Sequence, residues 1–337
     1  MRNFIWLIIG LMFFSPMQSL IAATKLGPPI EDLLSHPERN QIVIAEAIEK
    51  SESPRIRFAV REQLSGDSPA ELLLRTNEET FADVEVGRSY IVAWTELRRN
   101  RRIVAGWEKH SEGPYVLSLL GMGTDAVFEN TPELRFLFAD GTMEQSGNSG
   151  QQIDALLTQM QREDFRSRSL MISELYLRSD LTEQMQQSHA GTLKAILQNE
   201  PLDAQQRDFI IRSVRRLPQN LTSPWLAEEL RKIIILHGTQ YDLRSFVPGL
   251  VRTAARGLSE SGEPADIDLL SLLLYANNPG VSKAALTTMI RLDSVATVEK
   301  AQQAIERGWI HSETRMALTG FLGQAKTQST ARPVESR

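Results

Sequence analysis

Hydrophobic and polar positions divide the chain into three regions with different periods. An unbroken apolar run occupies residues 4–14. From about residue 40 to about residue 140, short runs of β-branched and aromatic residues alternate with turn residues, which is typical of strands. From about residue 150 to about residue 323, apolar residues recur with a helical period of about 3.6. The pattern predicts an apolar leader, a β-rich region and a helical region.

The leader has the order of a secretory signal peptide. Arg2 supplies a positive charge before the apolar run, Pro16 ends the run, and Ala22-Ala23 provide a small-residue cleavage site. An uncleaved membrane anchor is the alternative, but a spanning helix needs about 20 apolar residues, and this run has 11. Residues 1–23 are therefore predicted to be removed, and we expect no transmembrane segment in the mature chain.

The amino-acid composition limits where the protein can be located and which kinds of site it can contain. The 337 residues include no Cys, which excludes disulfides, thiolate metal sites and an acylated N-terminal Cys. An exported eukaryotic domain of this size would usually carry disulfides, so we expect a soluble periplasmic protein without a lipid anchor. The 37 basic and 42 acidic residues give a net charge of −5, which argues against a nucleic-acid partner.

The region before residue 140 is expected to start with a short helix at 29–36 and to continue as a small antiparallel barrel or sandwich. Strands are predicted at residues 41–48, 56–60, 72–74, 90–94, 103–107, 115–120 and 134–138. Residues 140–150 are rich in Gly, Asn and Ser, which predicts a linker to the helical region.

Three of these segments resemble a netrin-like domain, an OB-type β-barrel shared with tissue inhibitors of metalloproteinases. They are residues 42–47 (IVIAEA), residues 56–66 with their final Gly66, and residues 86–92 (VGRSYIV). The resemblance implies a turn at Gly66, a tight strand entry at Gly87 and a tendency to bind proteins. It does not imply protease inhibition, because the cysteines that the family uses are missing. Another small β-barrel or sandwich is the alternative.

The helical region reads as a series of helices joined by connections of two to six residues, which favours antiparallel neighbours. Helices are predicted at residues 149–161, 164–178, 181–197, 204–217, 223–237, 241–257 with a bend at Pro248, 267–275, 279–292, 295–308 and 312–323.

An internal repeat is visible within this region. Residues 153–180 align without gaps on residues 267–294, and Asp164 meets Asn278 at the expected N-cap of each second helix. Residues 277–286 (NNPGVSKAAL) resemble the turn and second helix of a HEAT repeat. The resemblance implies helical hairpins stacked into a curved solenoid, with an irregular helical bundle as the alternative.

These patterns together predict an α+β fold of two domains. We expect a signal peptide at 1–23, a β-rich barrel domain at 24–145, an α-helical repeat domain at 149–323 and a disordered tail at 324–337.

Catalytic motifs are scarce. Residues 147–150 (GNSG) resemble the nucleophile segment of trypsin-like proteases, with His110 and either Asp125 or Asp140 upstream. The cysteines of that family are missing, so a Gly/Ser linker in which Ser149 caps a helix is favoured. The histidines are scattered without metal-ligand spacing, at positions 36, 110, 189, 237 and 311. We expect no metal and no cofactor.

One cluster of arginines stands out in this acidic chain. Its members, with the two tryptophans that flank them, are Trp94, Arg98, Arg99, Arg101, Arg102 and Trp107. We expect them on a β-hairpin, where guanidinium groups suit an acidic protein surface, a lipid phosphate or a cell-wall carboxylate. A solvated hairpin whose charges deter strand pairing is the alternative. A second cluster, Arg212, Arg215 and Arg216, is interpreted as a solvated helix face.

The sequence favours a non-enzymatic, exported binding or scaffold protein that holds another envelope protein. An envelope hydrolase whose site is formed by distant residues is one alternative. A structural component that binds peptidoglycan or lipid is another.

Overall fold

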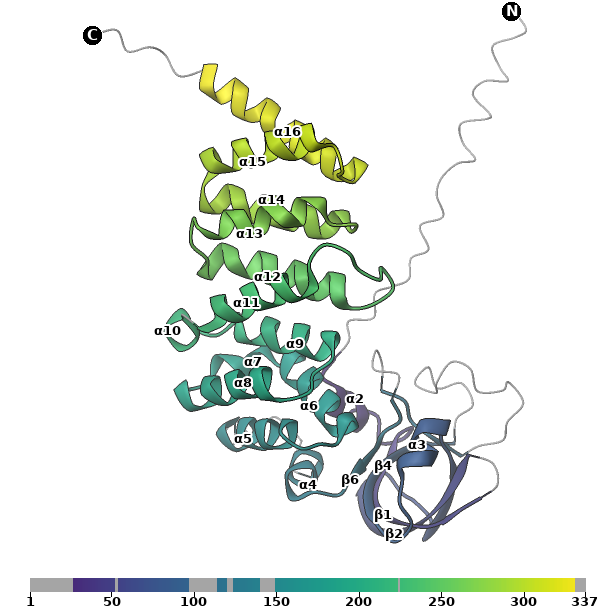
Figure 1. Cartoon of the computed structure of the whole chain (residues 1–337). Helices are drawn as coiled ribbons and strands as arrows, with labels where there is room; N and C mark the ends of the chain where they lie inside the picture. The colour runs from purple at the N-terminus through teal and green to yellow at the C-terminus, as the bar shows by residue number, and fades with distance from the viewer. Residues whose placement is uncertain are drawn as a thin grey trace, which may run out of the picture.

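The computed structural model describes residues 27–51, 54–96, 114–119, 124–139, 149–223 and 225–330. A small β-barrel is followed by a stack of helices, which confirms the predicted α+β fold class (Figure 1). The signal peptide and the segment that carries Arg98, Arg99, Arg101, Arg102 and Trp107 lie outside the described residues.

Five strands close the barrel. They pair in the order β1-β2-β3-β5-β4 and back to β1, and only the β3–β5 pair is parallel. A further strand, β6 (Val127–Glu129), pairs with β4 next to β5, and the short helix α3 (Glu78–Asp83) connects β3 to β4. The bounds of the five strands are Gln41–Lys50 (β1), Arg55–Ser65 (β2), Glu71–Arg75 (β3), Ser89–Thr95 (β4) and Tyr115–Val116 (β5).

Strands β1 and β4 bury both of their faces. Val43 and Val92 pair across the two strands and belong to the core inside the barrel. Their neighbours Ile44 and Ile91 also pair, but they belong to the core that the barrel shares with the helices. Because side chains alternate along a strand, the nearly continuous apolar runs of β1 and β4 supply two cores at once.

Two glycines occupy the turns that the netrin-like resemblance implies. Gly66 directly follows β2 and has a φ of +76°, and Gly87 precedes β4 and has a φ of +88°. Both values lie in the left-handed region that favours glycine.

The strand predicted at 134–138 is wrong, because these residues form helix α4 (Pro132–Ala139). Its buried residues Leu134, Leu137 and Phe138 follow a helical spacing, and the Thr131 hydroxyl caps the start by accepting a hydrogen bond from the Leu134 amide (3.2 Å). A run of five residues is too short to distinguish the helical period of 3.6 from the strand period of 2.

The helical stack consists of pairs whose members alternate between two layers. Layer A contains α5 (Ser149–Met160), α8 (Gln187–Asn199), α11 (Trp225–His237), α13 (Asp266–Leu272) with the 3-10 turn η1 (Leu273–Tyr275), and α15 (Ser294–Arg307). Layer B contains α6 (Phe165–Leu177), α9 (Ala204–Val214), α12 (Val247–Ser261), α14 (Pro279–Leu292) and α16 (Ser312–Thr330). Each layer-B helix packs against the next one in the layer.

The predicted repeat is reproduced by the burial pattern. Asp164 and Asn278 both cap the second helix of their pair. The aligned apolar positions are buried in both pairs, namely Ile153 with Ile267, Leu156 with Leu270, Met160 with Leu274, Met171 with Ala285, Ile172 with Leu286 and Leu175 with Met289.

Three predicted helical segments differ most from the structure. The segment 181–197 is split into α7 (Ser179–Glu183) and α8. The bent helix at 241–257 is instead a loop followed by α12, with Pro248 in the first turn, where its missing N–H costs no hydrogen bond. Helix α16 continues to Thr330, although a tail without structure was expected from residue 324.

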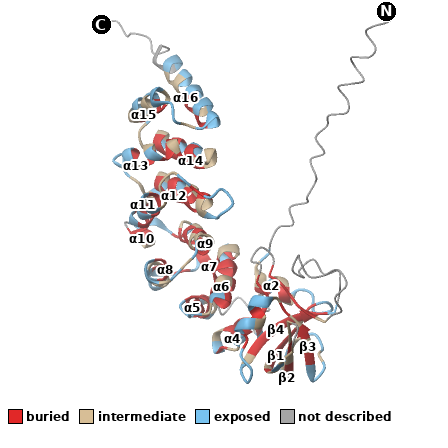
Figure 2. Ribbon diagram, turned by 45° about the vertical axis from the view of Figure 1, so that its right-hand side comes forward, coloured by how far each residue is buried: buried red, intermediate tan, exposed pale blue. Residues whose placement is uncertain are grey.

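The barrel and the stack share one continuous core (Figure 2). Helix α2 (Pro29–Leu34) and helix α4 lie between them, and apolar residues of α2, β1, β4 and α4 belong to the same buried cluster as the helices of the stack. Two polar contacts also join these parts. Arg166 of α6 pairs with Asp83 of α3 (2.8 Å), and the Thr131 hydroxyl donates a hydrogen bond to the side-chain oxygen Oε1 of Gln159 in α5 (2.9 Å).

Candidate binding surface on layer B

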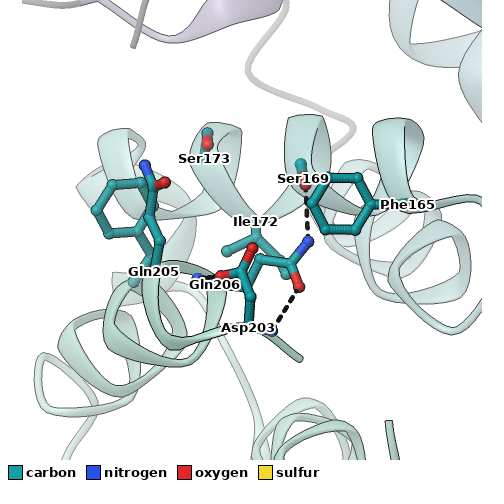
Figure 3. Close-up of a pocket in the computed structure, with 8 residues that line it drawn as sticks. Phe165, Ser169, Ile172, Ser173, Asp203, Gln205 and Gln206 are labelled. Atoms are coloured by element: carbon teal, nitrogen blue, oxygen red, sulfur yellow. Dashed lines mark hydrogen bonds between the residues drawn. The ribbon is translucent and has the colours of Figure 1, made fainter. Parts of the chain in front are cut away.

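A pocket of about 110 Å³ opens between α6 and α9, the first two helices of layer B. Figure 3 shows Phe165, Ser169 and Ser173 along α6, facing the α9 residues Gln205 and Gln206. The complete lining is Phe165, Ser169, Ile172, Ser173, Asp203, Gln205, Gln206 and Phe209. Two phenyl rings thus border a polar floor, which suits a side chain or group with both apolar and polar parts.

The floor of the pocket is fixed by the start of α9. Asp203 accepts a hydrogen bond from the Gln206 amide (2.7 Å), and the Gln206 side chain in turn accepts one from the Asp203 amide (3.2 Å). This capping box leaves the Gln206 side-chain amide to donate to Ser169 on α6 (2.7 Å). The two helices are therefore held in register at the pocket.

A tyrosine and two arginines lie next to the pocket residue Phe209. Tyr176 stacks on Phe209 with ring centroids 4.5 Å apart. The Arg216 guanidinium lies 5.1 Å from the Tyr176 ring and donates to the Tyr176 carbonyl (2.6 Å). Arg212 donates to the Tyr176 hydroxyl (3.3 Å) and pairs with Asp208 (2.8 Å). Two of the three arginines that were interpreted from sequence as a solvated helix face, Arg212 and Arg216, are thus held in place by Tyr176.

Charge is divided unevenly between the two layers. Each of the five layer-B helices carries two Lys or Arg residues, against four Asp or Glu residues in all five together. The layer-A helices carry five basic and seven acidic residues. Layer B is therefore positive within a chain whose net charge is −5.

Several layer-B cations have no acidic partner among the described residues. Arg215 pairs with Glu260 (2.6 Å), and Lys283 pairs with Glu313 (2.6 Å). By contrast, no carboxylate of the described chain lies within 4.0 Å of the guanidinium groups of Arg216, Arg252, Arg256 or Arg291. Unpaired cations on a solvent-exposed helix face are available to an anionic partner.

Trp94 is placed inside the barrel, where only 3% of its surface is exposed. Its indole N–H donates to the Ser68 hydroxyl (3.0 Å). A pocket of about 250 Å³ borders Trp94 at this end of the barrel, lined also by Glu38, Asp67 and Glu96. The role predicted for the arginine cluster stays a prediction, since its arginines lie outside the described residues.

The candidate catalytic residues are not brought together in the part of the chain that the structure describes. Asp125 is fully buried in the barrel, where it accepts a hydrogen bond from the Asn77 amide (2.8 Å), and burial raises its pKa to about 6. Ser149 begins α5, whereas His110 and Asp140 fall outside the described residues. Nor do three His, Asp or Glu side chains of the described residues gather as a metal site.

Comparison with protein-family models, with curated proteins and with solved structures finds no match to this chain. In the described part of the chain, no helix combines the length and the apolar character needed to cross a membrane.

Proposed function

We propose that this chain is an exported, non-enzymatic binding protein that holds a protein partner of the cell envelope on the layer-B surface. The observation that carries the proposal is the pocket between α6 and α9. Beside it, Arg216 is held against the Tyr176 ring and has no acidic partner among the described residues. Surfaces of this kind, with aromatic and Arg side chains around a small pocket, are typical of protein interfaces.

The architecture supports the same proposal. Paired helices in two layers are consistent with a HEAT-like solenoid, an architecture that presents extended surfaces to partners. The closed barrel with a helix between β3 and β4 is consistent with an OB-type domain. The apolar leader supports export to the periplasm. In this proposal the barrel fixes one end of the helical surface through the shared core.

The test is capture of envelope proteins by the immobilised chain without its leader. Gln205→Trp fills the pocket from its half-buried rim, and Glu228→Trp places the same bulk on the exposed face of α11 in layer A. We expect a specific protein to be retained by the wild type and by Glu228→Trp, and lost with Gln205→Trp. Equal retention by both variants, or retention on purified peptidoglycan or lipid alone, would contradict the proposal.

A further inference from the structure

Basic side chains of layer B occur on several neighbouring helices. Helix α9 contacts both α6 and α12, and α12 contacts α14. The Arg215–Glu260 ion pair joins α9 to α12, and the Arg291 guanidinium donates to the Ser259 hydroxyl of α12 (3.4 Å). The pocket, the Tyr176 stack and the unpaired arginines are therefore parts of one surface.

Helix α14 adds only positive charge to this surface, because it contains Lys283 and Arg291 but no Asp or Glu. In α12 the only acidic residue, Glu260, is already paired with Arg215, which leaves Arg252 and Arg256 as uncompensated charges. Arg256 is exposed and Arg252 is half-buried. A binding partner for this region must supply negative charge.

The pocket adds a second, different requirement. Its volume of about 110 Å³ is well below the roughly 300–1,000 Å³ of typical small-molecule sites. It therefore suits one side chain rather than a cofactor. Phe165 is 45% exposed at its edge, so an apolar side chain entering there would cover an exposed phenyl ring.

The dimensions fit a polypeptide in extended conformation. Packed helices lie about 8–10 Å apart, so the three steps from α6 to α14 cover roughly 25–30 Å. An extended chain advances about 3.3 Å per residue, so about nine residues would reach from the pocket to the α14 arginine. Figure 2 shows layer B on the inner side of a shallow arc, the side on which the barrel lies, and a flat lipid surface fits such a face poorly.

We infer that the partner presents an extended acidic segment to layer B. One apolar side chain of the segment enters the pocket between α6 and α9, and its carboxylates pair with Arg216, Arg252, Arg256 and Arg291. This inference rests on the proposed function and specifies the chemistry of the partner. Direct Arg–carboxylate hydrogen bonds would fix the register of the segment along the helices.

The test uses a labelled synthetic peptide of about twelve residues, built from Glu, Ser and Gly with one Leu near its end, and the chain without its leader. Fluorescence anisotropy should show saturable binding that weakens as salt rises. Replacing the Leu by Ser in the peptide should weaken binding about tenfold, and a peptide with Lys in place of Glu should not bind.

Two matched double variants test whether the charge that attracts the peptide lies on layer B. Arg252→Glu with Arg256→Glu should weaken peptide binding at least about tenfold. Lys194→Glu with Arg307→Glu makes the same net-charge change on layer A, where neither residue forms an ion pair with the described chain, and should leave binding within about twofold. Gln205→Trp should abolish the difference between the Leu and Ser peptides.

Equal weakening by the two double variants would overturn the inference, because it would show attraction by net charge alone. Binding to vesicles rich in phosphatidylglycerol that is lost in the Arg252/Arg256 variant, without peptide binding, would overturn it in favour of a lipid surface. If the peptide fails while capture of an envelope protein still depends on Gln205, the inference is wrong and the proposed function stands.

Discussion

At the scale of single residues, Glu174 is an acidic side chain buried in the core of the protein. Its side chain is 1% exposed between α6 and α2, and one carboxylate oxygen accepts a hydrogen bond from the Ile30 amide (2.9 Å). Arg178 lies 3.9 Å away but is also bonded to Asp180. Burial outweighs these favourable contacts and raises the pKa of Glu174 to about 7.

This pKa makes stability depend on pH in a defined direction. Between the ordinary pKa of 4.5 and about 7, the folded chain keeps the proton of Glu174 while the unfolded chain releases it. The free energy of unfolding should therefore fall as pH rises through this window and level off above it. Burial also raises the pKa of Asp125, to about 6, so Asp125 adds a contribution of the same sign that ends at lower pH.

Glu174→Gln should remove most of that slope and stabilise the protein at pH 8 by the order of 1–3 kcal/mol. Urea denaturation at pH 5 and pH 8 measures this. Glu183→Gln is the control, because Glu183 is exposed and forms no ion pair with the described residues. An unchanged slope in Glu174→Gln would show that Glu174 is ionised throughout.

The two turn glycines provide a second prediction at this scale. Gly87→Ala should cost about 1 kcal/mol, because its φ of +88° disfavours a side chain but the space around it is open. Gly66→Ala should cost more, since its Cβ would also overlap the Gln41 carboxamide, which bonds to the Asp67 amide and the Pro37 carbonyl. Thermal unfolding of the two variants ranks them, and equal losses would contradict the steric explanation.

At the scale of elements, local signals predicted most of the structure. The N-caps Asp164 and Asn278 were recognisable because each precedes an apolar period and has a short acceptor side chain. Short apolar runs were harder, as the misassigned α4 shows, and the three-residue strand β6 gave no usable signal. Its pairing depends on β4, a contact that local sequence does not encode.

Two caps with similar chemistry should have separable effects. Asn278 accepts hydrogen bonds from the Gly280 and Val281 amides (2.9 and 3.3 Å), and Asp203 holds Gln206 in the pocket floor. Replacing either cap by Ala should cost about 1 kcal/mol of stability. Only Asp203→Ala should also reduce the preference for the Leu peptide over the Ser peptide. If both variants reduce it equally, the pocket does not depend on the capping box.

At the scale of the whole molecule, the candidate surface arises from tertiary packing. Phe165 and Phe209 are 44 positions apart in the chain, and only the packing of α6 on α9 brings them to one pocket. The charge difference between layers A and B also could not be predicted from the sequence, because it appears only when each helix is assigned to its layer. The sequence could therefore predict the helices that carry the surface, but not the surface itself.

The shared core predicts that the barrel and the stack unfold together. Ile44 and Ile91 of the barrel are buried in the same cluster as the stack residues Ile153 and Leu170. Near-ultraviolet and far-ultraviolet circular dichroism of the chain without its leader should therefore give one coincident thermal transition. Two separated transitions would show that the barrel and the stack are independent domains.

We propose that layer B is the face that holds the partner. A photo-crosslinking amino acid placed in living cells at Arg256 of layer B, and in a parallel strain at Glu228 of layer A, tests it most directly, because both positions are exposed. We expect one discrete crosslinked protein from position 256 and none from position 228. Crosslinking from position 228 alone, or equally from both positions, would contradict it.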